Sequence, residues 1–472
     1  MTRPALGESG LAVAEIVGGK LFGPGKRPVT TVTIDSRTCG AGSLFVALPG
    51  EHTDGHLFVA DALRSGASMA LVRSDWASGR ETEISALLGE TDAGVCAVDD
   101  PLSALQDLAR ARLASFPHLR RVGITGSNGK TTTKELIASV LSQKDSTFKT
   151  RGNYNSEIGV PLSVFDVGEE HVFGVFELAM NHVGEMEVLA DIVRPDLAVI
   201  TNIGTAHIGL VGSQEAIAYE KRRVFSRFDG SQTAVLYESE PYRAVLEDGA
   251  AAHIVTFGPE TTLGYEGFEP RGVEGTVLRW RGRRIRLPLA GEHNVRNALA
   301  AITVGLQLGC SDDDIQAGLE SAQPEFGRGE VIRGTITVLH DSYNANVDSM
   351  RAAIELIAET PHRSGKKILV LGAMYELGSY TAAHHEAVAA SALASGADVT
   401  VLFGEEFEAA AKALSDQDAE ASKRLMWAGD IDELSSLISE TVREGDLVLL
   451  KGSRGTRLER LLPLLTRGGG GS

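Results

Sequence analysis

The sequence predicts an α/β protein of three domains, and three observations support this fold class. The chain has 472 residues, and a domain usually spans about 100–200, which suggests several packed units. Apolar runs that look like buried strands alternate with helical segments through most of the chain, as in mainly parallel sheets. Short breaker segments separate parts with different patterns. We therefore expect a small α/β domain, a central domain on a mainly parallel sheet and a C-terminal Rossmann-like domain.

The first two parts differ in their order of elements. Residues 1–100 mix the β-like runs TVTI and SLFVAL with the helical HLFVADALRSGA and close at Asp99-Asp100-Pro101. Residues 101–325 place RVGIT before KELIASVL, FGVFEL before GEMEVLADIV and LAVITN before SQEAIAYEKRRVF, an order that predicts parallel βαβ units. TVLRWRGRRIRLPL instead alternates like strands with one exposed face, which predicts an antiparallel addition.

The third part, residues 326–467, contains the buried-strand runs TITVLHD, KKILVLG, DVTVLFG and DLVLLKG. The helical stretches DSMRAAIELIAE, HHEAVAASALAS and TRLERLLPLL lie between and after them, so a Rossmann-like domain is predicted. The final residues, 468–472, have the composition of a flexible glycine-serine linker and are not expected to join the fold.

Composition excludes several classes of protein. The formal net charge is −18, which disfavours nucleic-acid binding because that binding depends on basic surface. No run approaches the roughly 18 apolar residues of a membrane span, and the first residues do not resemble a secretory signal, so a cytoplasmic protein is expected. Cys39, Cys96 and Cys310 are widely spaced, which argues against a disulfide framework or a thiolate metal site.

A glycine-rich run, GITGSNGKTTT, joins a predicted strand to a predicted helix. The strict pattern G-x-x-x-x-G-K-[ST] fails because Ile124 stands at its first glycine. The order of strand, turn and helix is nevertheless the one in which backbone amides and a helix N-terminus bind phosphate. Lys130 would reach the outer phosphates and the Thr131 hydroxyl would bind magnesium. The candidate ATP-binding residues of this loop are Gly126, Ser127, Asn128, Gly129, Lys130, Thr131 and Thr132.

Two further polar residues follow neighbouring strands. Glu177 ends FGVFEL, and His207 lies after the next strand, in TNIGTAHIG. Both should reach the carboxyl edge of the sheet, where α/β proteins bind ligands and where a carboxylate could hold magnesium. The residues alone also allow a surface carboxylate at a strand end and a structural histidine.

Several motifs occur in the order of a known family: GITGSNGKTTT, GNYNSEIGVPLSVF, FELAMNHVGEMEVLADIVRPDLAVITNIGTAHIG, GEHNVRNALAA, HDSYNANVDSM and KGSRGTRLE. Over about residues 30–465 the chain resembles the Mur ligases, ATP-dependent enzymes that build the peptide stem of bacterial peptidoglycan. IDSRTCGAGSLFVALPGEHTDGHLF, DSYNANVDSM and KGSRG look most like the member that adds D-alanyl-D-alanine to UDP-N-acetylmuramoyl-tripeptide.

The resemblance implies that residues 1–100 are a UDP-muramoyl substrate domain, that 101–325 are a central P-loop ATPase domain and that 326–467 are a Rossmann-like ligase domain. It also implies a mechanism. ATP would phosphorylate the tripeptide carboxylate, and the amine of D-alanyl-D-alanine would displace phosphate from the acyl phosphate to give UDP-N-acetylmuramoyl-pentapeptide. ATP and two magnesium ions would be required, and the domains of a monomeric enzyme would close over the substrates. The alternatives are a sister ligase that adds a single amino acid, a P-loop kinase, and a nucleotide-binding switch without ligase activity.

The resemblance also assigns the candidate catalytic residues, which are Lys130, Lys221, His207 and Glu177. Lys130 would hold phosphates, Thr131 and Glu177 would bind one magnesium ion, and His207 would help to place the second. Lys221 matches a lysine that carbon dioxide carbamylates, which replaces an ammonium with an anionic metal ligand. Without the resemblance, Lys221 would be interpreted as a surface helix lysine.

Other nucleotide contacts are implied in the same way. Asn294 and Asn297 match asparagines that read the adenine, although their pattern alone suits helix-surface residues or, for Asn294, a cap. Arg328 matches an arginine that contacts phosphate at a domain junction, and Asp341 would bind the ribose. A polar loop beside the nucleotide would contribute Tyr343, Asn344 and Asn346, although any loop can have this composition.

Substrate recognition is implied for segments in all three domains. The residues associated with the uridine nucleotide are Asp35, Ser36, Arg37, Asp54, Gly55 and His56. Those of a loop that faces the muramoyl-peptide are Asn153, Asn155 and Ser156. Lys451, Ser453 and Arg454 stand where cations could bind the dipeptide carboxylate, or form an ordinary strand-to-helix turn. In one departure, Ala373 replaces an acidic residue of the family, with Glu376 and His385 nearby in sequence.

Overall fold

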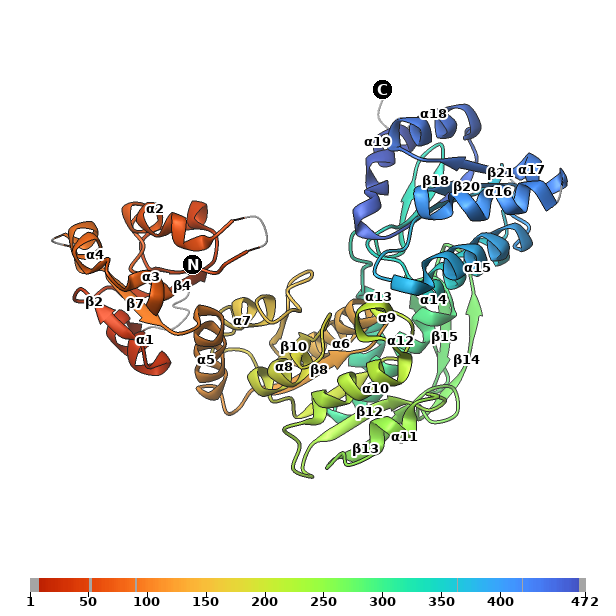
Figure 1. The fold of residues 1–472 in the computed structure, drawn as a ribbon. Coiled ribbons are helices and arrows are strands. Elements are labelled where there is room, and N and C mark those ends of the chain that lie inside the picture. The colour runs from red at the N-terminus through yellow and green to blue at the C-terminus, as the bar shows by residue number, and fades with distance from the viewer. Residues whose placement is uncertain (1–7, 51–52, 90, 363, 418, 467–472) are drawn as a thin grey trace, which may run out of the picture.

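The computed structural model describes residues 8–50, 53–89, 91–362, 364–417 and 419–466. They form three lobes, each built on a sheet, with the N- and C-terminal lobes standing on either side of the central one (Figure 1). We call them the N-terminal lobe (8–98), the central lobe (101–321) and the C-terminal lobe (330–466). The predicted α/β fold class is confirmed.

The N-terminal lobe contains a five-stranded sheet in the order β2-β7-β6-β5-β4. Its strands are β2 (Lys20–Phe22), β4 (Thr31–Thr33), β5 (Ser43–Val46), β6 (Met69–Arg73) and β7 (Gly94–Val98). They run parallel except for β2, which pairs with β7 in the antiparallel sense. The remaining elements of the lobe are β1 (Glu8–Ser9), β3 (Pro28–Val29), α1 (Gly10–Val17), α2 (Val59–Arg64), α3 (Ser74–Ala77) and α4 (Glu81–Leu88).

The central lobe contains a six-stranded parallel sheet in the order β13-β12-β11-β8-β10-β9. Its strands are β8 (Arg120–Thr125), β9 (Thr147–Lys149), β10 (Phe173–Glu177), β11 (Leu197–Ile200), β12 (Thr233–Tyr237) and β13 (His253–Phe257). After β8 the chain forms β9 and β10 on one side of β8 and then crosses to form β11 on its other side. The loop after β8 therefore lies between the carboxyl ends of β10 and β11. Ligands bind at such a switch point in open α/β sheets.

Helices cover both faces of this sheet. Apolar residues on one face pack with α6 (Lys130–Lys144), α12 (Glu292–Gln307) and α13 (Asp312–Ser321). The other face packs with α5 (Pro101–Ala114), α7 (Gly159–Val164), α8 (Glu185–Val193) and α10 (Gln214–Arg222). The short α11 (Arg243–Glu247) lies between β12 and β13 in the chain. The predicted antiparallel addition is also present, as β14 (Tyr265–Pro270), β15 (Thr276–Trp280) and β16 (Arg283–Leu287).

The C-terminal lobe is a doubly wound sheet in the order β17-β18-β22-β19-β20-β21. Its strands are β17 (Glu330–Arg333), β18 (Thr337–Asp341), β19 (Lys367–Gly372), β20 (Val399–Phe403), β21 (Leu425–Ala428) and β22 (Leu447–Lys451), and only β17 pairs antiparallel. Its helices are α14 (Val347–Glu359), α15 (Thr381–Ala394), α16 (Glu408–Gln417), α17 (Ala419–Arg424), α18 (Ile431–Thr441) and α19 (Leu462–Leu465).

One predicted element is wrong. TRLERLLPLL, residues 456–465, was expected to be a single helix, but Arg457 adopts a left-handed backbone conformation with φ of 52° and divides the segment into short 3₁₀ turns followed by α19. Leu458, Leu461 and Leu465 are still buried in the core of the C-terminal lobe, because 3₁₀ turns can also present every third side chain to one face.

Cys39, Cys96 and Cys310 are free thiols. Among the described residues, no helix combines the length and the apolar character needed to cross a bilayer.

Candidate active site

The glycine-rich loop lies at the centre of the site. It follows β8, and Gly129 caps α6, which begins at Lys130. Gly126 and Gly129 have φ of 147° and 77°, conformations that favour glycine. A Cβ added to Gly126 would lie 1.9 Å from Thr201 Oγ1, and one added to Gly129 would lie 2.5 Å from Asn297 Oδ1. Both glycines are therefore required by the backbone and by close packing.

The segment after β11 holds this loop in place, a role that sequence reasoning missed. The Thr201 hydroxyl donates to the Asn128 carbonyl at 2.6 Å, and the Asn128 amide donates to Asn202 Oδ1 at 3.0 Å. The Ser127 amide donates to the Asn202 carbonyl at 3.0 Å. The loop is thus preformed, and the position of the TN dipeptide directly after a buried strand was the available signal.

Lys130 turns back over the loop. Its ammonium donates to the carbonyls of Gly126 at 2.8 Å and Ser127 at 3.3 Å, and burial lowers its pKa to about 8. No carboxylate within the described residues forms an ion pair with it. A cation held only by carbonyl oxygens can pair with an incoming phosphate.

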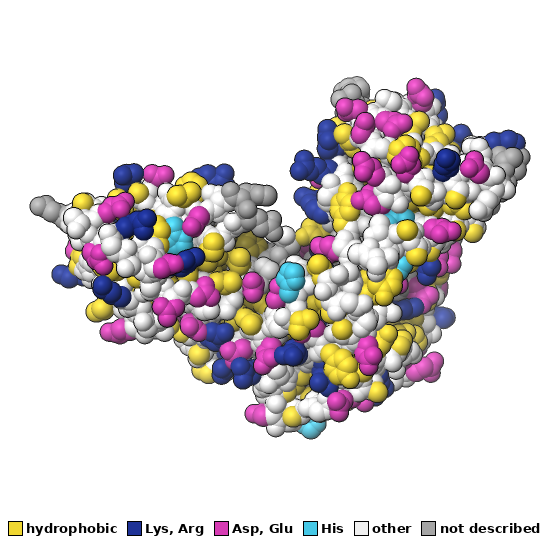
Figure 2. Space-filling model, viewed as in Figure 1, with side chains coloured by type: hydrophobic (Ala, Val, Ile, Leu, Met, Phe, Trp, Pro, Cys, Tyr) yellow, Lys and Arg dark blue, Asp and Glu magenta, His cyan; other side chains and the backbone are white. Residues whose placement is uncertain are grey.

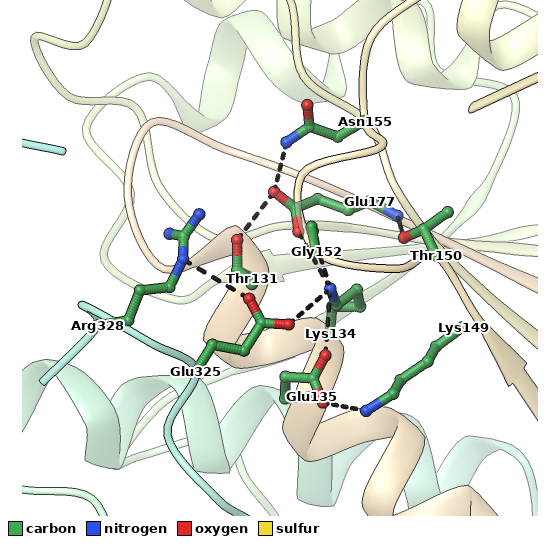
Figure 3. A network of polar contacts seen from close by, with 10 residues as sticks. All are labelled: Thr131, Lys134, Glu135, Lys149, Thr150, Gly152, Asn155, Glu177, Glu325 and Arg328. Carbon is green, nitrogen blue, oxygen red and sulfur yellow. Dashed lines mark hydrogen bonds and ion pairs between the residues drawn. The ribbon is translucent and has the colours of Figure 1, made fainter. Parts of the chain in front are cut away.

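Glu177 is buried rather than on the surface, so the surface alternative is wrong. Its side chain is 1% exposed. Oε1 accepts hydrogen bonds from the Thr131 hydroxyl at 3.0 Å and from Asn155 Nδ2 at 2.8 Å (Figure 3). Oε2 has no hydrogen-bond partner and lies 3.7 Å from Lys134 Nζ. Thr131, Asn155 and Glu177 therefore form one cluster with an unused carboxylate oxygen.

Lys221 is also fully buried, on α10, and its interpretation as a surface residue is wrong. Its Nζ has no hydrogen-bond partner. Burial, together with the nearby Lys130 cation, lowers the pKa of Lys221 well below its usual value. The buried amine is therefore biased toward its neutral form.

His207 connects the central lobe to the C-terminal lobe. It precedes α9 (Ile208–Val211), has φ of 63°, and its Nδ1 lies 2.8 Å from Glu376 Oε2. The Gly209 amide donates to the Glu376 carbonyl at 3.1 Å. The hydrogen bond from His207 lowers the pKa of Glu376. No hydrogen bond between described residues links His207 to Glu177.

Asn294 and Asn297 lie on α12 beside the loop and are each 7% exposed, which excludes the helix-surface alternative. Asn297 Nδ2 donates to Asn294 Oδ1 at 3.0 Å, and the Thr133 hydroxyl donates to Asn297 Oδ1 at 3.2 Å. Gly291 rather than Asn294 is the N-cap of the helix.

The C-terminal lobe reaches the loop through the polar segment after β18. Asn346 caps α14, and its Nδ2 donates to Asn128 Oδ1 at 2.7 Å. The Arg328 guanidinium lies 3.9 Å from the centre of the Tyr343 ring, and Arg328 also pairs with Glu325 at 3.9 Å. The Asn128–Asn346 hydrogen bond therefore places an amide of the C-terminal lobe directly on the loop.

Asp341 and the KGSRG segment form a separate group. Asp341 pairs with the buried Lys451 ammonium at 2.7 Å, and Lys451 also donates to the Asn344 carbonyl at 3.2 Å. The buried Ser453 hydroxyl accepts from the Tyr375 amide at 3.0 Å. Arg454 is 58% exposed on its side chain and is the accessible cation of this segment.

The unusual Ala373 directly follows β19 and contacts the same segment. It is fully buried, and its carbonyl accepts from the Ser453 amide at 3.0 Å. A Cβ on Gly404 would lie 3.1 Å from its methyl group. The neighbouring His385 is buried and accepts from the Met374 amide at 3.0 Å.

The N-terminal candidates form two local pairs in the N-terminal lobe. Arg37 and Asp35 pair at 2.6 Å on the surface, and Ser36 begins the 3₁₀ turn that Asp35 caps. The buried His56 pairs with Asp54 at 2.6 Å and accepts from the Arg73 amide at 3.0 Å. No hydrogen bond among the described residues joins these pairs to the phosphate loop.

The loop at 153–156 is closer to the centre. Asn155 contacts Glu177 as described, Asn153 is exposed, and the Ser156 hydroxyl accepts from the Gly159 amide at 3.2 Å. Beside the start of α6 lies a small pocket that opens to solvent. It is lined by Thr131, Thr132, Glu135, Leu136, Leu289, Ala322, Gln323, Pro324, Glu325 and Arg328.

Family models match most of the chain. The Mur ligase family catalytic domain matches residues 28–113, the Mur ligase middle domain matches 124–305, and the Mur ligase glutamate ligase domain matches 327–454. The UDP-N-acetylmuramoyl-tripeptide--D-alanyl-D-alanine ligase of Treponema pallidum is 42% identical over 94% of this chain and 95% of its own length. The Bacillus subtilis ligase of the same name is 34% identical over 95% and 96%.

Solved structures are similar over the same extent. MurF from Acinetobacter baumannii has a TM-score of 0.85 at 31% identity and covers 97% of this chain and 98% of its own. MurF ligase from Thermotoga maritima in complex with ADP has a TM-score of 0.77 at 28% identity and covers 93% and 97%.

The packing of Gly129 against Asn297 can be tested with Gly129→Ala. We expect at least about tenfold weaker ADP binding by isothermal titration calorimetry, because the new Cβ needs positive φ and overlaps the asparagine. Gly249→Ala is the matched control, since Gly249 has a similar φ of 67° but open space around the added Cβ. Equal ADP affinity in the two variants would contradict the assigned packing.

Proposed function

The chain belongs to the Mur ligase family, and from this premise we propose that it uses ATP to join D-alanyl-D-alanine to UDP-N-acetylmuramoyl-tripeptide. The observation that carries the proposal is the buried Thr131–Glu177 pair beside the glycine-rich loop, where Lys130 bonds the loop carbonyls, together with a buried Lys221 amine on α10 that has no hydrogen-bond partner. A kinase or a nucleotide switch would use the loop and the carboxylate but has no need of a buried, unpartnered amine. The names of the similar ligases support the dipeptide as the amine substrate.

ATP is proposed to bind with its phosphates on the loop. The loop amides and the N-terminus of α6 provide positive potential, and Lys130 would exchange its carbonyl partners for phosphate oxygens. Asn294 and Asn297, which lie on α12 beside the loop, would bind the adenine base. Arg328 would contact phosphate, while Asp341, Tyr343 and Asn346 would complete the site from the C-terminal lobe.

The donor set fits magnesium, which prefers oxygen ligands. Thr131 and Glu177 would hold one ion, because Glu177 Oε2 is buried without a hydrogen-bond partner. His207 would help to place a second ion through Nε2, since Nδ1 faces Glu376, and a carbamate on Lys221 would add anionic oxygens. Bound magnesium would neutralise charge on the phosphates during transfer.

The reaction needs two orienting tasks from the protein. Asn153, Asn155 and Ser156 would position the tripeptide carboxylate for attack on the γ-phosphorus of ATP, with ADP as the leaving group. The dipeptide amine would then add to the carbonyl carbon of the acyl phosphate, and phosphate would leave as the amine loses one proton. Lys451, Ser453 and Arg454 would form the dipeptide site, with the exposed Arg454 best placed to meet its carboxylate. The uridine end would be bound by residues of the N-terminal lobe, which are Asp35, Ser36, Arg37, Asp54 and His56.

We propose that the enzyme acts in the cytoplasm as a monomer.

The first test is phosphate release with ATP, Mg²⁺, UDP-N-acetylmuramoyl-tripeptide and D-alanyl-D-alanine, with each substrate also omitted in turn. We expect turnover only with the complete set, a product heavier than the tripeptide by the dipeptide minus water, and no turnover in excess EDTA. Lys130→Ala should lower kcat/KM by more than about 100-fold, as loss of a transition-state charge partner does. Turnover with one substrate, or equal turnover with a single amino acid, would refute the proposal.

Carbamylation of Lys221 can be tested without turnover. A neutral buried amine adds to carbon dioxide with formation of an N–C bond and release of one proton, so we expect a ¹³C carbamate resonance in enzyme equilibrated with ¹³C-bicarbonate. Lys221→Ala should lack the resonance, whereas Lys144→Ala, which changes a lysine that donates to loop carbonyls on the surface, should retain it. A resonance that persists in Lys221→Ala would contradict the assignment.

Domain closure is the third expectation. Figure 2 shows a hollow between the N- and C-terminal lobes, with cationic side chains along the C-terminal edge that faces it. Substrates bound to all three lobes should draw these edges together. Small-angle scattering should show a smaller radius of gyration with an ATP analogue and the UDP-tripeptide together, and an unchanged radius would count against closure.

A further inference from the structure

A buried lysine outside the predicted site contacts three segments at once. Lys134 lies one helical turn after Lys130 on α6, and its side chain is fully buried. Its ammonium lies 3.1 Å from Glu135 Oε1, 3.4 Å from Glu325 Oε1 and 3.7 Å from Glu177 Oε2. It also donates to the Gly152 carbonyl at 3.3 Å (Figure 3).

The surrounding charges form a closed group. The three carboxylates are balanced by Lys134 itself and by two outer cations, Lys149 on Glu135 and Arg328 on Glu325. Burying an ion is unfavourable unless its charge is compensated, so removal of the fully buried Lys134 would leave the carboxylates around it uncompensated, whereas water can compensate for loss of the half-exposed Lys149. Lys134 is the only described cation that contacts all three carboxylates, so the group depends on it.

The partners of Lys134 belong to different parts of the proposed reaction. Glu177 belongs to the proposed metal site, and Gly152 belongs to the loop that carries Asn153 and Asn155. Glu325 pairs with Arg328, which contacts the Tyr343 ring of the C-terminal lobe. Thr131 and Asn155 both donate to Oε1 of Glu177, so Lys134 is the group that acts on the other oxygen. Its position therefore controls how the carboxylate is turned and where the loop lies.

We propose that Lys134 is a positioning residue that sets the orientation of the Glu177 carboxylate and fixes the 152–156 loop against the phosphate-loop helix. The proposal rests on the proposed function, since it deepens the role of the same site. The ammonium attracts Oε2 over 3.7 Å without forming a hydrogen bond, which leaves that oxygen able to bind a cation. Loss of the ammonium would release both the carboxylate and the loop.

The test compares Lys134→Met with Lys149→Ala, which removes a half-exposed lysine that contacts only the outer side of Glu135. Binding of Mn²⁺ in the presence of ADP is measured by electron paramagnetic resonance, together with KM for each substrate. We expect Lys134→Met to weaken Mn²⁺ binding about tenfold and to raise KM for the UDP-tripeptide about tenfold, with KM for D-alanyl-D-alanine within about twofold of wild type. Lys149→Ala should change none of these values more than twofold.

Two further variants separate positioning from folding. Lys134→Met/Glu325→Gln removes one uncompensated carboxylate and should restore the melting temperature while Mn²⁺ binding stays weak. Lys134→Arg keeps the charge and should recover Mn²⁺ affinity to within about threefold of wild type. If Mn²⁺ affinity and both KM values are unchanged in the folded Met variants, and only the active fraction falls, the positioning role is refuted.

The Mn²⁺ measurement also keeps this inference distinct from the proposed function. A wild-type enzyme that binds Mn²⁺ and ADP but does not make the pentapeptide would refute the ligase assignment alone. Weakened Mn²⁺ binding in the Lys134 variants would then still support the role of Lys134 toward Glu177.

Discussion

Charge buried at the carboxyl edge of the central sheet is the constraint on which the rest of the site depends. Glu177 lies 1% exposed at the end of β10, and a buried ion requires hydrogen bonds and an opposite charge. Oε1 has two donors, but Oε2 has none. Lys221 is also buried but has no hydrogen-bond partner among the described residues. Burial lowers the pKa of Lys221 and so favours the neutral amine. By contrast, the Glu177 carboxylate keeps one buried oxygen with which a bound cation could pair.

The strand order explains why these groups meet. With β8 between β10 and β11, the loop after β8, Glu177 after β10 and Asn202 after β11 end at one edge. The C-terminal lobe adds Asn346 and Glu376 to this edge through contacts with Asn128 and His207. The N-terminal candidates stay in their own lobe. The residues proposed for activation are therefore concentrated on the central sheet, whereas those proposed for the uridine nucleotide and the dipeptide lie on the outer lobes, which stand on either side of a hollow (Figure 2).

Local patterns and burial differ in how far sequence can predict them. The phosphate loop and the strand-end position of Glu177 were predictable, because a strand, a glycine turn and a helix are adjacent in the chain. The surface alternatives for Glu177, Lys221, Asn294 and Asn297 were wrong, because burial depends on segments distant in sequence. Lys134 was missed for the same reason. A lysine four residues after Lys130 looks like any helix lysine until Glu177 and Glu325 are folded around it.

The sequence by itself determined the α/β class, the order of the strands and helices, the antiparallel addition, the phosphate loop and, through its motifs, the family. These features follow from hydrophobic period and from turn residues, which act over a few positions. Only the tertiary structure decided which ionisable groups are buried together, that His207 contacts Glu376 across two lobes, and that Arg457 breaks the last predicted helix. Electrostatic pairing and burial depend on distances through space, and the sheet order that sets those distances is a property of the whole folded chain.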